Sequence, residues 1–101
     1  MLYELSKDAE NDLKEVARYT RKHWGQEQLY KYRDGLKGTF NAIGSKTVNA
    51  RQFSSKYPQL RVTKYRYHYI FYIEEGMDKP VIIGVIHEKM DVVNRLASRL
   101  G

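Results

Sequence analysis

The chain has 101 residues, no cysteine and a net charge of +6, from 18 basic and 12 acidic side chains. This length favours a single domain covering residues 1–101, and the lack of cysteine excludes disulfides, thiolate zinc sites and cysteine nucleophiles. Since a charged residue stands at position 4 and no apolar run approaches the roughly 20 residues of a membrane helix, we expect a cytoplasmic protein with no membrane partner.

The N-terminal part of the sequence predicts a short strand and then a helix. Met1 to Leu5 has alternating apolar residues and is expected to be a strand, after which Ser6 can cap a helix from Lys7 to His23. Residues of one face recur in this helix at helical spacing: Ala9, Leu13, Val16, Ala17, Thr20 and Trp24. Gly25 then interrupts the pattern, and a short glycine turn predicts an antiparallel hairpin with a following helix.

A second helix is predicted from Gln26 to Gly44. Its apolar stripe steps by three or four residues through Leu29, Tyr32, Leu36, Phe40 and Ile43. Gly35 and Gly38 lie inside this helix, where each is less favourable than alanine by about 1 kcal/mol. We therefore expect both glycines to permit close packing on the first helix.

The region after the hairpin predicts strands. Gly44 to Pro58 shows no clear period and is interpreted as a loop with at most one helical turn. Leu60 to Lys64 and Tyr67 to Glu74 are rich in β-forming residues, and a tight connection at Tyr65–Arg66 would join them. Glu75 to Pro80 is expected to be a turn.

The C-terminal part predicts one more strand and a helix. Val81 to His87 is almost entirely β-branched, which indicates a strand covered on both faces, and Asp91 can cap a helix that runs to Leu100. The predicted order is β-α-α-β-β-β-α. The expected fold class is α+β, with the helix hairpin packed on a small, mainly antiparallel sheet.

The basic residues are unevenly distributed. No acidic residue stands between Asp34 and Glu74, where the following cations occur: Lys37, Lys46, Arg51, Lys56, Arg61, Lys64 and Arg66. An anionic partner, either nucleic acid or an acidic protein segment, would suit this charge, and an ordinary basic surface explains it equally well.

The stretch from Arg61 to Tyr72 interleaves basic and aromatic residues. Side chains alternate between the faces of a strand, so neither face of this stretch is purely aromatic or purely basic, and most of its tyrosines are interpreted as packing residues. Arg61 and His68 are the hardest to explain by packing. His68 and His87 are expected on neighbouring strands, where they can meet and where packed or surface histidines are the simpler interpretation.

The sequence contains no recognisable cofactor or metal motif. The three histidines, including His23 at a helix end, lack the spacing of metal ligands, so we expect no metal site. No glycine-rich phosphate loop follows a strand and no serine has a nucleophile-elbow context, so we expect no cofactor and no small-molecule substrate. His87 to Asp91, "HEKMD", crowds four chemically active side chains behind a strand, which fits a functional turn or a solvated one equally well.

Three blocks of the sequence, taken in order, resemble the ParE branch of the RelE/ParE toxin superfamily of type II toxin–antitoxin systems. Leu5 to Gly25 is similar to the pattern "A..DL..I..YT...WG", and Leu60 to Tyr72 is similar to the paired strands with "Y.I.Y". Val81 to Asp91 is similar to the closing strand that ends in "LH..MD". The resemblance implies a toxin that acts on DNA gyrase with its bound DNA, stabilises the cleaved-DNA complex and is neutralised by a ParD-type antitoxin.

The resemblance also suggests where such contacts would lie. We expect the gyrase-facing surface on the later strands and the C-terminal region, at Arg61, His68, His87, Glu88, Lys89, Met90 and Asp91. The antitoxin is expected on the helix hairpin and the open face of the sheet, at Leu29, Tyr30, Arg33, Tyr65 and Tyr69. These surfaces would be adhesive, with no catalytic residue.

The alternative is a ribosome-dependent mRNA interferase of the RelE type. The chemistry of those relatives needs several cations around the scissile phosphate and often a tyrosine near the C-terminus. Here the strand "VIIGVIH" carries no arginine and no tyrosine follows Tyr72, which favours the ParE interpretation. Arg61, His68 and His87 keep the nuclease alternative open.

Overall fold

The computed structural model describes residues 2–100. Its elements are β1 (Glu4–Leu5), α1 (Lys7–Trp24), α2 (Gln26–Gly44), β2 (Arg51–Ser54), β3 (Tyr57–Tyr65), β4 (His68–Ile73), β5 (Val81–His87) and α3 (Val92–Leu100). The strands form one sheet in the order β1-β5-β4-β3-β2, in which β1 runs parallel to β5 and all other pairs are antiparallel. The predicted α+β class is therefore confirmed. Within the described range, none of the helices is long and apolar enough to cross a membrane.

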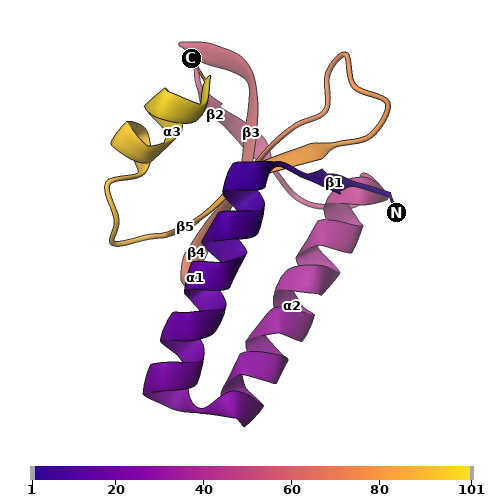
Figure 1. The fold of residues 1–101 in the computed structure, drawn as a ribbon. Helices are drawn as coiled ribbons and strands as arrows, with labels where there is room; N and C mark the ends of the chain where they lie inside the picture. The colour runs from indigo at the N-terminus through magenta and orange to yellow at the C-terminus, as the bar shows by residue number, and fades with distance from the viewer. Residues whose placement is uncertain (1, 101) are drawn as a thin grey trace.

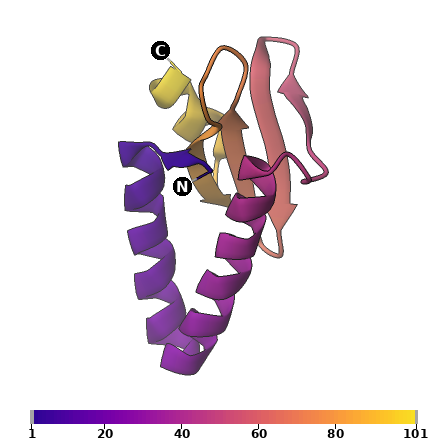
Figure 2. The same ribbon diagram turned by 90° about the vertical axis from the view of Figure 1, so that its right-hand side faces the viewer.

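The helix hairpin has the local signals that the sequence predicts. The Ser6 hydroxyl accepts a hydrogen bond of 3.1 Å from the Ala9 amide at the start of α1, and basic residues occupy its last turn, where they complement the helix dipole. Gly25 has φ +88°, a conformation that L side chains rarely adopt, and this glycine makes the tight reversal into α2. The two helices diverge from that turn, and their joined ends project beyond the sheet (Figures 1 and 2).

Helices cover both faces of the sheet, so the core has two parts. On the hairpin face, α1 and α2 pack on the inner side chains of β4 and β5, among them Ile70, Tyr72, Ile82 and Val85. On the opposite face, α3 places Leu96 against Leu60, Val62, Phe71 and Ile86. Figure 1 shows α2 and α3 on opposite sides of the strands. The prediction that the strand ending at His87 is covered on both faces is confirmed.

A buried ion pair joins α3 to α1. The Asp12 carboxylate accepts two hydrogen bonds from the Arg99 guanidinium, at 2.6 and 2.9 Å, and a third, at 2.9 Å, from the backbone amide of Val85. Arg99 also donates to the Ile83 carbonyl at 3.1 Å. These contacts attach the last helix to the first through β5, and they satisfy a carboxylate that is only 5% exposed.

The segment predicted as a loop from Gly44 to Pro58 is partly strand, so that prediction was wrong. β2 pairs with β3, which itself begins at Tyr57. Phe53 is the one large apolar side chain of β2, and its ring contacts that of Phe71 edge-on at 5.2 Å between centroids. The four residues of β2 are too few and too polar to show a period, so their pairing with β3 decides their conformation.

Smaller differences occur at element ends. β1 comprises only Glu4 and Leu5, and Met1 of the predicted strand lies outside the described residues. The turn between β3 and β4 is at Arg66–Tyr67, one residue later than predicted, with Arg66 at φ +49°. Trp24, expected on the apolar stripe of α1, is 68% exposed because the end of the hairpin projects past the sheet.

The two glycines inside α2 differ in their surroundings. The prediction that both permit close packing on α1 was wrong. A Cβ on Gly35 would lie 1.8 Å from the Tyr65 hydroxyl on β3, whereas a Cβ on Gly38 would meet nothing within 4 Å. Gly35 thus allows α2 to approach the sheet.

This difference gives a matched pair of predictions. Gly38→Ala should raise the free energy of unfolding by about 0.5–1 kcal/mol, because alanine is the better helix former. Gly35→Ala should lower it by about 1–3 kcal/mol, because the added methyl group displaces the Tyr65 ring. Chemical denaturation of both variants measures the contrast. Equal stabilisation by the two substitutions would show that Tyr65 moves aside freely and would contradict the packing role of Gly35.

Candidate functional site

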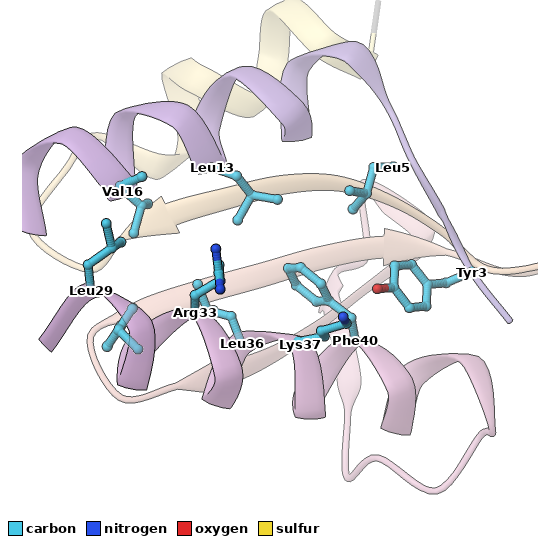
Figure 3. Close-up of a pocket in the computed structure, with 11 residues that line it drawn as sticks. Tyr3, Leu5, Leu13, Val16, Leu29, Arg33, Leu36, Lys37 and Phe40 are labelled. Atoms are coloured by element: carbon cyan, nitrogen blue, oxygen red, sulfur yellow. The ribbon is translucent and has the colours of Figure 1, made fainter. Parts of the chain in front are cut away.

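A groove lies between the two helices of the hairpin and is called the hairpin groove below. It has a volume of about 230 Å³ and is lined by Tyr3, Leu5, Leu13, Val16, Ala17, Leu29, Tyr32, Arg33, Leu36, Lys37 and Phe40. Figure 3 shows the Arg33 side chain between α1 and α2, with Leu13 and Val16 on the facing helix. The lining has nine apolar or aromatic residues, two cations and no acidic residue. The groove therefore suits an apolar segment that also carries negative charge.

A second groove runs between α1 and the ends of β4 and β5. It consists of two adjoining pockets, of about 650 and 410 Å³, which share Tyr19, Thr20, His68, His87 and Lys89. We call it the histidine groove. Its first pocket extends along α1 to Asp12 and includes Met90, and its second extends to Trp24 at the hairpin end and to Tyr67 at the β3–β4 turn.

Two histidines meet at the bottom of this groove, as the sequence suggested. His68 and His87 are register partners on β4 and β5, and their ring centroids are 5.1 Å apart and nearly perpendicular. A hydrogen bond of 2.6 Å joins the Tyr32 hydroxyl to Nδ1 of His68, and the Lys89 amide donates to Nδ1 of His87 at 3.1 Å. One ring nitrogen of each histidine is thus engaged within the protein.

Burial holds His68 in its neutral form. Desolvation is the main cause that lowers its pKa from 6.5 to about 4, and the neighbouring His87 lowers it further, against the opposing effects of Asp12 and Glu88. Burial also raises the pKa of the Tyr32 hydroxyl. At neutral pH the pair Tyr32–His68 is therefore an uncharged hydrogen-bonded unit.

The lowered pKa of His68 predicts a loss of stability in acid. The unfolded chain binds a proton at His68 near pH 6.5 and the folded chain only near pH 4, so this group's stabilising contribution is complete above pH 6.5 and declines as the pH falls to 4. Because the ring is partly solvated, we expect a decrease of on the order of 1–2 kcal/mol in the free energy of unfolding.

Urea denaturation between pH 7 and pH 4 measures this effect. His68→Asn removes the titrating group and should flatten the pH dependence in that window, whatever its effect on absolute stability. The control is His23→Asn, because His23 is exposed at the end of α1. If the free energy of unfolding depended on pH in the same way in the original protein and in His68→Asn, the acid effect would not come from His68.

The residues predicted to face gyrase do not all lie together. His68, His87, Glu88, Lys89 and Met90 line the histidine groove. Asp91 instead caps α3 through the Asn94 amide at 3.2 Å. Arg61 pairs across the sheet with Tyr72 and donates to the Ala50 carbonyl at 3.1 Å. Arg61 precedes Tyr65, the strand partner of His68, by four residues of β3. This separation along the strand is about 13 Å.

The residues predicted for the antitoxin are also divided. Leu29 and Arg33 line the hairpin groove, and Tyr30 lies beside Arg33, whose guanidinium is 5.1 Å from its ring. Tyr65 is beneath α2, in edge contact with Tyr32 at 5.1 Å. Tyr69 packs on the opposite face of the sheet with the α3 side of the core. Only the three residues from α2 thus belong to one surface.

Several residues of the histidine groove were missed in the sequence. Tyr32 was interpreted only as part of an apolar stripe, and its hydroxyl becomes a polar partner because the β3–β4 turn closes over it. Trp24 was predicted to lie on the apolar stripe of the first helix and Tyr19 was not singled out, although their exposed fractions are 68% and 58%. Asp12 gave a readable signal, since it stands three residues after Ala9 and four before Val16, on the buried side of α1.

Comparisons with known proteins agree on one family. The family model described as "ParE toxin of type II toxin-antitoxin system, parDE" matches residues 3–92. A relative from Escherichia coli, described as "Toxin ParE", is 32% identical over 98 residues, which are 97% of this chain and 95% of that protein. A solved structure described as "Chromosomal ParDE TA system from P. aeruginosa" is similar with a TM-score of 0.71 and 13% identity, over 84% of this chain and 92% of that chain. At that identity the likeness shows the fold alone.

Proposed function

The chain belongs to the ParE toxin family of type II toxin–antitoxin systems, and on that premise we propose that it inhibits DNA gyrase by stabilising the cleaved-DNA complex. A ParD-type antitoxin would neutralise it. The observation that carries this proposal is the family match over residues 3–92, which includes both helices of the hairpin and every strand.

We further propose that the toxin acts without catalysis of its own. Cleavage of a phosphodiester needs cations that offset the developing charge around the phosphate. Near the histidine pair, Lys64 is engaged with Glu88 at 3.1 Å, and Arg61 is too far along β3 to take part. Among the described residues this leaves Lys89 and Arg18 as the unpaired cations of the histidine groove, fewer than the several cations that RelE-type cleavage uses. His68 is held neutral with Nδ1 bonded to Tyr32, which suits a packing role better than proton transfer.

The proposed gyrase contact is the outer part of the histidine groove. The turn after β5 presents Glu88, Lys89 and Met90 beside His68 and His87. Met90 is 43% exposed, an apolar side chain on the rim of a groove and therefore a candidate anchor for a protein partner. Arg61 and Asp91 are left out of this contact, because the first bonds to a neighbouring carbonyl and the second caps a helix.

The hairpin groove is the proposed seat of the antitoxin segment. Its aliphatic lining would take the apolar face of an amphipathic segment, and Arg33 and Lys37 would pair with that segment's acidic residues. An antitoxin tail that is disordered alone and folds on binding fits such a preformed groove.

The test is a supercoiling assay with purified gyrase and ATP. We expect supercoiling to fall and linear DNA to accumulate after denaturation of the complexes. Met90→Glu should weaken this effect by about tenfold or more, whereas the control Met77→Glu, at an exposed methionine between β4 and β5, should not. Unaffected gyrase together with cleavage of mRNA on ribosomes would support the RelE-type alternative. Normal growth on induction without antitoxin would contradict toxicity altogether.

A further inference from the structure

Three large aromatic side chains are exposed around one end of the histidine groove. Trp24 is 68% exposed, Tyr67 59% and Tyr19 58%. Tyr19 and Trp24 come from α1 where the hairpin projects past the sheet (Figure 2), and Tyr67 comes from the β3–β4 turn. All three line the same pocket of about 410 Å³. Exposed aromatic side chains that gather around a pocket indicate a binding surface.

The lining of this pocket is aromatic and contains no aliphatic side chain among the described residues. Six of its ten residues carry aromatic rings: Tyr19, Trp24, Tyr32, Tyr67, His68 and His87. The hairpin groove, by contrast, is mostly lined by leucine, valine, alanine and aromatic residues. A peptide with aliphatic anchors would fit the hairpin groove, whereas planar rings favour a ligand that stacks.

The charges at this groove favour an anionic ligand. Each acidic residue that lines its two pockets is paired with a cation: Asp12 with Arg99 at 2.6 Å, Glu15 with Arg95 at 3.7 Å and Glu88 with Lys64 at 3.1 Å. Lys89 lines both pockets and Arg18 lines the adjoining larger one, and neither forms an ion pair within residues 2–100. Two cations thus remain available to phosphate groups.

The aromatic rings differ in how they are engaged within the protein. The Tyr19 ring lies beside that of His23, with centroids 4.2 Å apart, so its opposite face is the one that a ligand would reach. The rings of Tyr67 and His87 are nearly parallel, at 20°, with centroids 6.4 Å apart, close to the upper limit of about 7 Å for interacting ring pairs. His87 thus orients Tyr67 with little direct contact, and most of the Tyr67 surface faces solvent. Gln28 on α2 adds an amide that can hydrogen-bond a base edge at the same pocket.

We propose that this pocket binds a single-stranded nucleic acid segment, with one or two bases stacked on Trp24, Tyr19 or Tyr67 and the adjoining phosphates beside Lys89 and Arg18. Bases must be unstacked to reach such rings, so a duplex should bind less well. This inference goes beyond the proposed function, since it concerns the toxin alone and needs neither gyrase nor antitoxin.

Trp24 is the only tryptophan of the chain and therefore reports on its own pocket. The experiment titrates the full-length toxin with a 12-nucleotide single-stranded DNA and with the matching duplex, and follows both Trp24 fluorescence and the anisotropy of a labelled strand. We expect quenching by the single strand, tighter binding than to duplex and a fall in affinity with salt that corresponds to about two phosphate contacts.

Two variants keep the fluorescence reporter and test the stacking contribution of the pocket. Tyr67→Ala should weaken binding of the single strand by about 5- to 150-fold, the range for removal of one stacking partner. Tyr30→Ala, a control at an exposed tyrosine of α2 that does not line the pocket, should leave the affinity unchanged. Circular dichroism verifies that both variants are folded.

The proposal would be overturned by no binding of the single strand, by equal binding of the duplex, or by equal binding of Tyr67→Ala. Binding of isolated gyrase subunits at this pocket, measured by the same Trp24 signal and without any binding of the oligonucleotide, would assign the pocket to a protein partner instead. Failure of the gyrase assay would leave the oligonucleotide result unchanged, so the two proposals fail separately.

Discussion

Replacement of Arg99 by alanine is expected to lower the free energy of unfolding by about 3 kcal/mol, more than the loss of the solvent-exposed ion pair that α3 forms through Arg95. The guanidinium forms a two-point pair with the buried Asp12 carboxylate, and this hydrogen bond raises the pKa of Arg99. Removing one member of a buried pair leaves the other charge without compensation, which is the costly case. In the variant, the Asp12 carboxylate would keep only the hydrogen bond from the Val85 amide.

Arg95 provides a matched control on the same helix. It pairs with Glu15 of α1, so it joins the same two helices, but at 3.7 Å and with both side chains well exposed. Arg95→Ala should therefore change the free energy of unfolding by less than about 1 kcal/mol. Chemical denaturation of both variants, with a double-mutant cycle between Asp12→Ala and Arg99→Ala, measures the pair itself. Equal effects of the two arginine substitutions would contradict a special role for Arg99.

Introduction of a glutamate at Ala17 is expected to weaken binding of a ParD-type antitoxin by about 100-fold. Ala17 lines the hairpin groove from α1, and a charge placed there would be desolvated by the apolar side of a bound segment. It would also repel the acidic residues that Arg33 and Lys37 are proposed to bind. Glutamate is a good helix former, so α1 should remain folded. Isothermal titration with the antitoxin gives the affinity.

Ala97→Glu is the control, because Ala97 is exposed on α3 and lies outside the groove. The same chemical change there should leave antitoxin binding as it is. Since Ala17 does not line the histidine groove, Ala17→Glu should still inhibit gyrase, and cells should arrest despite co-expressed antitoxin. Unchanged affinity of a folded Ala17→Glu variant would place the antitoxin segment on another surface.

Much of the fold follows from local patterns. Ser6 and Gly25 mark the start of α1 and the hairpin turn, and the stripe from Leu29 to Ile43 identifies the buried face of α2. β2 escaped detection because four mostly polar residues carry no period and depend on β3 for their hydrogen bonds. Gly35 was recognised as unusual, yet its neighbour is Tyr65 of the sheet, which no spacing within the helix can reveal.

The candidate site was predicted less completely. The meeting of His68 and His87 follows from strand alternation and an antiparallel connection, and the structure confirms it. Arg61 looked functional because packing did not explain it, but its guanidinium bonds to the Ala50 carbonyl, a partner supplied by a segment interpreted as loop. Trp24 looked like a core residue because a helical period does not show where a helix extends past its sheet.

The sequence by itself determined the identity and order of most elements, the absence of thiol chemistry and the family, because periodicity, caps and turn residues act over a few neighbours. Only the tertiary structure decided which side chains meet: the Asp12–Arg99 pair across 87 positions, the Tyr32–His68 bond across 36, and the gathering of Tyr19, Trp24 and Tyr67 around one pocket. Such contacts depend on how the sheet and helices are placed in space, and no local interaction along the chain encodes that placement.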